Sequence, residues 1–201
     1  MLKNLNTLER LALGLFTALL LLSAGLFLYQ QNLSPQHAEA RLGGNFSLNS
    51  ASGPVSLSDF AGKGVIIMFG YASCPDVCPS GLANVAAALN RLSASKQAQL
   101  QPLFISVDPD RDTPDRLEEY SRYFHPSLRG LTGSKNEIDA VVEAYGGFYQ
   151  KVSTPDSKMG YSVDHSARIY LIKRNGELSQ RLFHNSPVAE ITTALDLLLE
   201  E

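Results

Sequence analysis

Residues 64–82 read GVIIMFGYASCPDVCPSGL and hold both cysteines of the 201-residue chain. The first part, GVIIMFGY, is a continuous apolar and β-branched run, which is typical of a strand buried on both faces. Beyond Cys74 and Cys78, apolar residues recur with a helical period from Pro79 to about Ser95. The stretch therefore predicts a buried strand, a cysteine-bearing loop and a helix, in that order.

Patterns on either side of this stretch predict the remaining elements of the domain. They are a hairpin around Ser52–Pro54, a buried strand over 100–108, helices over 113–124 and 134–145, a short strand over 148–153, a hairpin over 167–183 and a helix from Pro187. Asn175-Gly176 at the tip of the last hairpin predicts a type I′ turn. This order predicts an α/β, thioredoxin-like fold, in which a mixed central sheet is flanked by helices and preceded by an N-terminal β-hairpin.

The N-terminal region contains the uncharged run LALGLFTALLLLSAGLFLY at residues 11–29. A helix of about 19 residues, rising about 1.5 Å per residue, nearly spans a bilayer core. Lys3 and Arg10 precede the run, and no positive residue follows it before Arg41. This asymmetry predicts a cytoplasmic N-terminus. We expect a cytoplasmic segment at 1–10, a transmembrane anchor at 11–29, a linker at 30–41 and the thioredoxin-like domain at 42–201.

A cleaved signal peptide is the alternative interpretation of this region. The small-x-small site Ala38-Glu39-Ala40 lies about ten residues beyond the apolar run, which is itself longer than a usual signal core. Both observations favour an uncleaved, single-pass anchor in the inner membrane with the domain in the periplasm. In such an oxidising compartment, thiols form disulfides unless they are kept reduced or bind a metal.

The charged residues give little reason to expect nucleic acid or calcium. The formal net charge is -3, and the basic residues form no stripe, so we expect no nucleic-acid partner. The acidic run Asp108–Asp112 partly resembles a calcium-binding loop, but Thr113 stands where such a loop needs glycine. The run is predicted instead to form a loop and a helix cap.

Cys78 is predicted to lie in the first turn of a helix that Asp76 could cap, with Cys74 in the loop above it, so that both sulfurs lie near the start of the helix. The positive end of the helix dipole favours thiolate, the form that both a nucleophile and a metal ligand need. The spacing Cys74-x-x-x-Cys78 differs from the C-x-x-C of thioredoxin, and a metal site, a disulfide switch and a simple staple all remain open. A dinuclear copper electron-transfer centre is excluded, because Leu82 and Val85 occupy the places of its histidine and methionine.

Among the four histidines, His165 is the candidate ligand. It stands just before a predicted buried strand, in the loop that faces the cysteine loop in thioredoxin-like folds. That loop usually carries a cis-proline, but here Asp164-His165 takes its place. The other three are expected in the linker (His37), at a helix C-terminus (His125) and exposed after the last hairpin (His184).

Four segments of the chain together resemble the Sco/SenC family of copper proteins: YASCPDVCPSGL, FISVDPDRDTPD, LTGS and YSVDHSARIYLI. The resemblance covers about residues 42–200. It implies a membrane-anchored metallochaperone that delivers copper to the dinuclear copper site of cytochrome c oxidase, with Cys74, Cys78 and His165 as ligands of Cu(I) and Cu(II). Residues 71–73, Tyr-Ala-Ser, depart from the Phe-Thr-His often found in the family, but that histidine is not a required ligand.

The chemistry of the residues agrees with this implication and leaves alternatives. Two thiolates suit Cu(I), and imidazole also suits Cu(II). Asp164 is expected either to orient the site or to lie in water. The alternative functions are a thiol–disulfide oxidoreductase, with Cys74 and Cys78 as its redox pair, and a copper or redox sensor. Expected partners are the copper-bearing subunit of cytochrome c oxidase and either a thiol reductase or another copper chaperone.

Overall fold

The computed structural model describes residues 7–33, 42–157 and 159–200. The chain divides into two units, Met1–Ala40 and Arg41–Glu201. Helix α1 (Thr7–Leu33) belongs to the first unit, and its described side chains between Leu11 and Phe27 are exposed. Within the described ranges, no helix meets the combined requirement of length and apolarity for crossing a membrane. Most of the predicted linker, including His37, lies outside the described residues.

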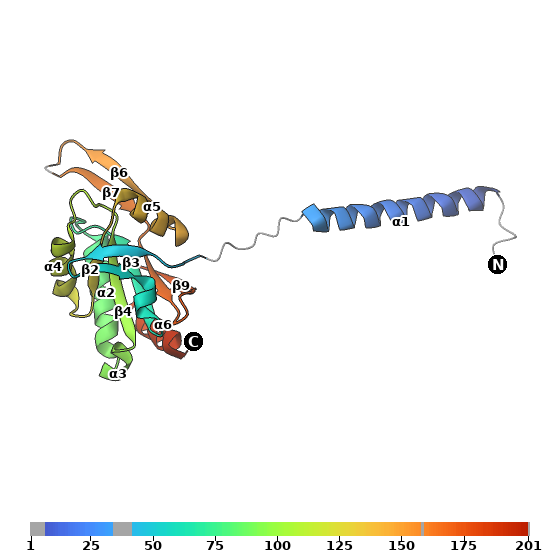
Figure 1. Ribbon diagram of the computed structural model, residues 1–201. Helices are drawn as coiled ribbons and strands as arrows, with labels where there is room; N and C mark the ends of the chain where they lie inside the picture. Colours follow the sequence, from blue (N-terminus) through green and yellow to red (C-terminus); the bar gives the residue numbers. More distant parts are fainter. Residues whose placement is uncertain (1–6, 34–41, 158, 201) are drawn as a thin grey trace. The chain divides into compact units, whose positions relative to one another are not determined.

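The second unit is built on a five-stranded mixed sheet with the order β5-β4-β3-β8-β9 (Figure 1). Its strands are β3 (Gly64–Gly70), β4 (Leu100–Ser106), β5 (Arg129–Leu131), β8 (Arg168–Ile172) and β9 (Leu178–Phe183). The first three are parallel to one another, while β8 is antiparallel to both β3 and β9. Two hairpins stand beside this sheet, β1 (Ser47–Ser50) with β2 (Gly53–Ser56), and β6 (Tyr149–Thr154) with β7 (Gly160–His165).

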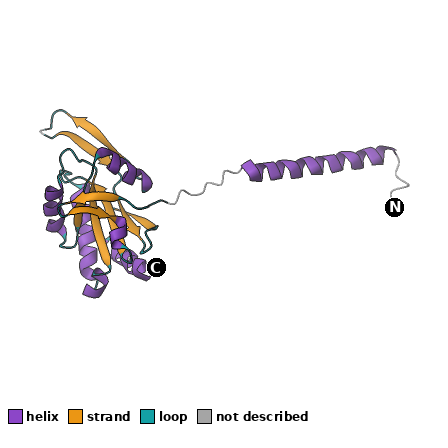
Figure 2. Cartoon of the chain, in the orientation of Figure 1, coloured by secondary structure: helices purple, strands orange, loops and turns teal. Residues whose placement is uncertain are grey.

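Helices cover both faces of the sheet, as Figure 2 shows. They are the 3-10 helix η1 (Leu57–Phe60), α2 (Val77–Arg91), α3 (Ala94–Gln97), α4 (Pro114–Phe124), α5 (Lys135–Ala144) and α6 (Val188–Glu200). Every residue of β3 is buried, and successive side chains point to opposite faces. Met68 packs against Gly81 of α2, whereas Phe69 contacts Tyr145 at the end of α5. The predicted α/β fold with a mixed central sheet is confirmed.

Two helix starts follow from local side-chain chemistry. Thr113 Oγ1 accepts a hydrogen bond from Arg116 N at the start of α4. Ser134 and Glu137 form a reciprocal capping box at the start of α5. Each cap satisfies backbone N–H groups that have no partner inside the helix, which contributes about 1 kcal/mol. Both predicted starts are confirmed.

Three predictions about strands and turns were wrong or incomplete. The three-residue strand β5 was not predicted, because so short a run shows no period. His165 lies at the end of a strand, β7, rather than in a loop. The turn between β8 and β9 is not type I′, which needs positive φ at two residues. Only Gly176 there has positive φ, at 86°, and its N–H donates to Lys173 O (2.9 Å), so a left-handed glycine follows an ordinary turn.

Candidate functional site

The cysteines lie where β3 ends and α2 begins. Cys74 is in the connecting loop, where its N–H donates to Tyr71 O (3.1 Å), and Cys78 is the second residue of α2. Both are buried free thiols. A Cβ atom added at Gly70 would lie 2.7 Å from Cys78 Sγ, so glycine at the end of β3 makes room for the sulfur.

The two thiols differ in their protonation. A hydrogen bond with Cys78 lowers the pKa of Cys74 to about 5, although burial opposes this, and the backbone N–H groups of Asp76 and Cys78 add to the lowering. The same hydrogen bond, together with burial, raises the pKa of Cys78. Asp76 occupies the N-cap position, but its side chain makes no capping bond to the described residues. The shared hydrogen bond therefore makes Cys74 the more acidic of the two thiols.

His165 reaches this pair from β7. Its Nε2 atom lies 3.4 Å from Cys78 Sγ, and its Nδ1 atom lies 3.1 Å from Val163 O. Because a carbonyl oxygen can only accept, Nδ1 carries the ring proton in the neutral imidazole, and the Nε2 lone pair faces the sulfur. The Tyr71 ring meets the imidazole edge to face, with centroids 5.8 Å apart. The structure thus brings Cys78 and His165 together.

The distance between sulfur and nitrogen suits a shared metal ion. Two ligands on a tetrahedral ion, with bonds of about 2.0 and 2.3 Å, lie about 3.5 Å apart. The described part of the chain contains no preassembled group of three or more Cys, His, Asp or Glu side chains that could hold a metal. The ligand roles of Cys74, Cys78 and His165 stay a prediction.

Comparison with known proteins identifies the family of this chain. A family model described as SCO1/SenC matches residues 34–200. The chain belongs to the SCO1/SenC family. It is 42% identical over 139 residues to the Arabidopsis thaliana protein named Protein SCO1 homolog 1, mitochondrial. That match covers 69% of this chain and 41% of the relative, so the chain spans less than half of the relative's length.

Solved structures agree with this assignment. The crystal structure of Arabidopsis thaliana ScoI with copper bound is similar with a TM-score of 0.73 and 38% identity, over 79% of this chain and 98% of that one. The fold is also similar to BsSco, described as a member of the Sco family of cytochrome c oxidase assembly proteins. That likeness has a TM-score of 0.62 at 21% identity, over 80% of this chain and 94% of BsSco, and it shows the fold alone.

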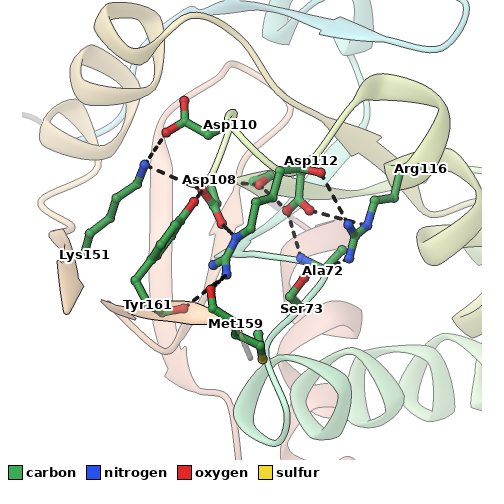
Figure 3. A network of polar contacts seen from close by, with 11 residues as sticks. Ala72, Ser73, Asp108, Asp110, Asp112, Arg116, Lys151, Met159 and Tyr161 are labelled. Carbon is green, nitrogen blue, oxygen red and sulfur yellow. Dashed lines mark hydrogen bonds and ion pairs between the residues drawn. The ribbon is translucent and has the colours of Figure 1, made fainter. Parts of the chain in front are cut away.

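The loop after β4 supports the cysteine loop of this SCO1/SenC chain (Figure 3). Asp112 is buried, and its Oδ2 atom accepts hydrogen bonds from Ala72 N (2.8 Å) and Ser106 Oγ (2.6 Å). Arg116 of α4 donates to Ser73 Oγ (2.8 Å). The two residues that precede Cys74 are thereby held from outside their own loop. The sequence predicted a loop and cap beside the proposed copper site for residues 108–112, but it did not predict this contact.

The other residues considered as site candidates lie apart from the cysteines or stabilise the fold. His125 is the buried C-cap of α4, as predicted, and burial lowers its pKa. His184 was predicted to be exposed but is half-buried. Its Cβ atom lies beside Gly81 of α2, and its backbone carbonyl accepts a hydrogen bond from Asn84. Asp164 is exposed, and the Val163 carbonyl, rather than that carboxylate, orients the imidazole.

Proposed function

We propose that this chain is a membrane-anchored copper chaperone that binds copper as its cargo through Cys74, Cys78 and His165. The observation that carries the proposal is the 3.4 Å separation of Cys78 Sγ and His165 Nε2. Beside it lies the Cys74 thiol, whose pKa is lowered to about 5 through its hydrogen bond with Cys78. Cys74 is the more acidic thiol and would lose its proton to an incoming copper ion more readily than Cys78.

The donor set explains why copper is the proposed cargo. Thiolates are soft ligands that select Cu(I), and imidazole also suits Cu(II). Three protein ligands leave a coordination position open to a ligand from a partner. A site of this kind can hold copper in both oxidation states and still release it, whereas a closed four-ligand site would retain it.

Membership of the SCO1/SenC family supports a proposal for the protein that receives the copper. The related Arabidopsis ScoI has been solved with copper bound, and BsSco is described as a member of the Sco family of cytochrome c oxidase assembly proteins. We therefore propose that the chain helps assemble the dinuclear copper site of the copper-bearing oxidase subunit. A thiol reductase or a second copper chaperone would act before it, to reduce or load the cysteines.

Replacement of His165 tests the ligand set. His165→Ala is expected to weaken Cu(II) binding by at least about a hundredfold, the upper end of the cost of losing an outer-shell partner, because the imidazole is the proposed ligand best suited to Cu(II). Cu(I) binding changes less, since the two sulfurs remain. Competition titrations with a chelator, performed for each oxidation state, measure both affinities. His184→Ala is the control, and unchanged Cu(II) affinity in His165→Ala would remove His165 from the proposed site.

A second function, thiol–disulfide exchange, is favoured by the unequal thiols. The Cys74 thiolate would attack a partner's disulfide, and one partner sulfur would leave as thiolate. Cys78, on losing its proton, would then attack the mixed disulfide at Cys74 and release the second partner sulfur. The partner gains two electrons, this chain ends with a Cys74–Cys78 disulfide, and an external dithiol must reduce it again. The same pair could sense copper or oxidants.

The membrane anchor is proposed from the sequence alone. Residues 11–29 carry no charge, the positive residues Lys3 and Arg10 precede them, and no positive residue follows before Arg41. This asymmetry favours a cytoplasmic N-terminus, a linker at 30–41 and a periplasmic domain. The full chain, expressed in a bacterium, is expected to resist alkaline extraction from membranes at its unprocessed mass. A variant lacking residues 1–40 serves as the extractable control. Release of the full chain, or a mass showing cleavage after Ala40, would exclude an uncleaved anchor.

A further inference from the structure

We propose that Arg111 is a positioning residue that holds the His165-bearing hairpin over the cysteine loop. Its importance for copper rests on the proposed function, whereas its effect on the geometry can be measured without metal. Arg111 is not itself proposed to bind copper, and it acts through Tyr161 and the β7 backbone.

The hairpin that carries His165 needs such support. Within the described residues, β6 and β7 pair only with each other and form a separate two-stranded sheet. An isolated two-stranded hairpin is marginally stable in water. Figure 1 shows this hairpin extending beyond the five-stranded sheet. The position of His165 over Cys78 must therefore depend on contacts with other parts of the domain.

Arg111 supplies contacts of this kind from the loop after β4. Its Nη1 atom donates to Tyr161 O (3.1 Å) and to Met159 O (3.4 Å). Its guanidinium carbon lies 3.8 Å from the centroid of the Tyr161 ring, within the range of a cation–π contact. The Arg111 side chain thus contacts both the backbone of β7 and the ring of Tyr161, four residues before His165.

A buried carboxylate fixes the position of this arginine. Asp108 is fully buried, and it accepts hydrogen bonds from Arg111 Nε and from the Tyr161 hydroxyl (2.7 Å). A buried charge persists only when it is paired and hydrogen-bonded. Figure 3 shows Tyr161 directed towards Asp108. Arginine, tyrosine and aspartate therefore form a unit in which each side chain restrains the others.

The same loop also holds the opposite half of the site. The Arg111 guanidinium carbon lies 5.5 Å from the Tyr71 ring centroid, and that ring contacts the His165 imidazole. The next residue, Asp112, accepts from Ala72 N just ahead of the cysteines. Residues 108–112 therefore fix the cysteine loop and the His165 hairpin together. The spacing of sulfur and imidazole follows from this shared attachment.

The consequence for copper is selective. Cys74 and Cys78 belong to one short segment and stay close to each other without the hairpin. His165 comes from a distant segment and needs the hairpin to be held in place. Loss of Arg111 should therefore release the imidazole while the paired sulfurs stay in place. The affinity for Cu(II) should then fall more than the affinity for Cu(I).

The test compares Arg111→Met with the wild-type full chain. In the reduced, metal-free protein, the nuclear Overhauser contact between the rings of Tyr71 and His165 is expected to disappear. Cu(II) affinity should fall by about tenfold to a hundredfold, with loss of the imidazole nitrogen coupling in the electron paramagnetic resonance spectrum. Cu(I) affinity should stay close to the wild-type value.

Two further variants make the test specific. Lys151→Met is the comparison variant, because Lys151 of β6 also lies over the Tyr161 ring, at 4.7 Å, pairs with Asp110 and lies 3.9 Å from Asp108 Oδ1. Among the described residues, its side chain makes no hydrogen bond to the β7 backbone such as Arg111 makes. This variant should keep the ring contact and the nitrogen coupling. Tyr161→Phe removes only the hydroxyl bond to Asp108, and it should weaken the ring contact in the same direction as Arg111→Met, but by less.

Each outcome bears on the proposal. Retention of the ring contact and the nitrogen coupling in Arg111→Met would overturn it, as would an equal loss in Lys151→Met. If Arg111→Met does not fold, the proposal is tested by Tyr161→Phe. An unchanged contact between the Tyr71 and His165 rings in that variant counts against the proposed role of Arg111. If the wild-type chain binds no copper, the proposed function fails, but the ring contact in the metal-free variants still tests Arg111.

Discussion

Cu(I) affinity of the reduced full chain falls by at least about a hundredfold, or about 2.7 kcal/mol, in Cys74→Ser and in Cys78→Ser. A serine hydroxyl is a hard oxygen donor, and Cu(I) prefers soft sulfur. Neither variant can replace the missing thiolate, because the chain has only two cysteines. Both sulfurs are therefore expected to be required for binding of about one copper per chain.

Anaerobic titration of Cu(I) against a competing chelator measures this loss. Ser80→Ala, in the same first turns of α2, is the control for a local disturbance of the helix, since Ser80 Oγ bonds only the Val77 carbonyl among the described residues. Stoichiometric Cu(I) binding that survives in either cysteine variant would contradict the proposed ligand set.

The same variants separate the two candidate functions. A chaperone needs both sulfurs equally. In thiol exchange the roles differ, because the Cys74 thiolate attacks and Cys78 resolves. Cys78→Ser should then accumulate a mixed disulfide with a disulfide-bonded model peptide, whereas Cys74→Ser should not react. Rapid exchange by the metal-free wild-type chain would favour the oxidoreductase, and negligible exchange alongside tight copper binding would favour the chaperone.

Gly130→Ala is expected to destabilise the domain by about 3 kcal/mol, at the upper end of the cost of overpacking. A Cβ atom added at Gly130 would lie 2.5 Å from the backbone oxygen of Leu117 and 2.6 Å from its carbonyl carbon. These are backbone atoms of α4, which packs directly on β5. The helix must move to accept the methyl group, and Arg116, which bonds Ser73 beside the cysteines, moves with it.

Chemical denaturation of the full chain, followed by near-ultraviolet circular dichroism, measures the change in the free energy of unfolding. Gly62→Ala is the control, because its added Cβ meets open space but its φ is +83°. That backbone strain alone costs about 1 to 2 kcal/mol. A loss in Gly130→Ala no greater than in Gly62→Ala would show that α4 accommodates the methyl group easily.

Local patterns in the sequence were enough to predict much of the fold. The run GVIIMFGY predicted β3, and Thr113 and Ser134 predicted the starts of α4 and α5. Such features depend on residues a few positions apart, where burial pattern and hydrogen-bonding chemistry act directly on the backbone. Placement of Cys78 in the first turn of a helix, with Cys74 in the loop before it, followed from the same local rules.

The arrangement of the site depends on contacts between distant segments. Cys78 and His165 are 87 positions apart, and Ala72 and Asp112 are 40 apart. No spacing rule links such residues, and the topology of thioredoxin-like folds and then the family resemblance, rather than periodicity, suggested the histidine as a ligand. Strand β7 and its attachment through Arg111 were not predicted. Their positions follow from closing long loops around a packed core and pairing buried charges, a balance that exists only once the whole domain has folded.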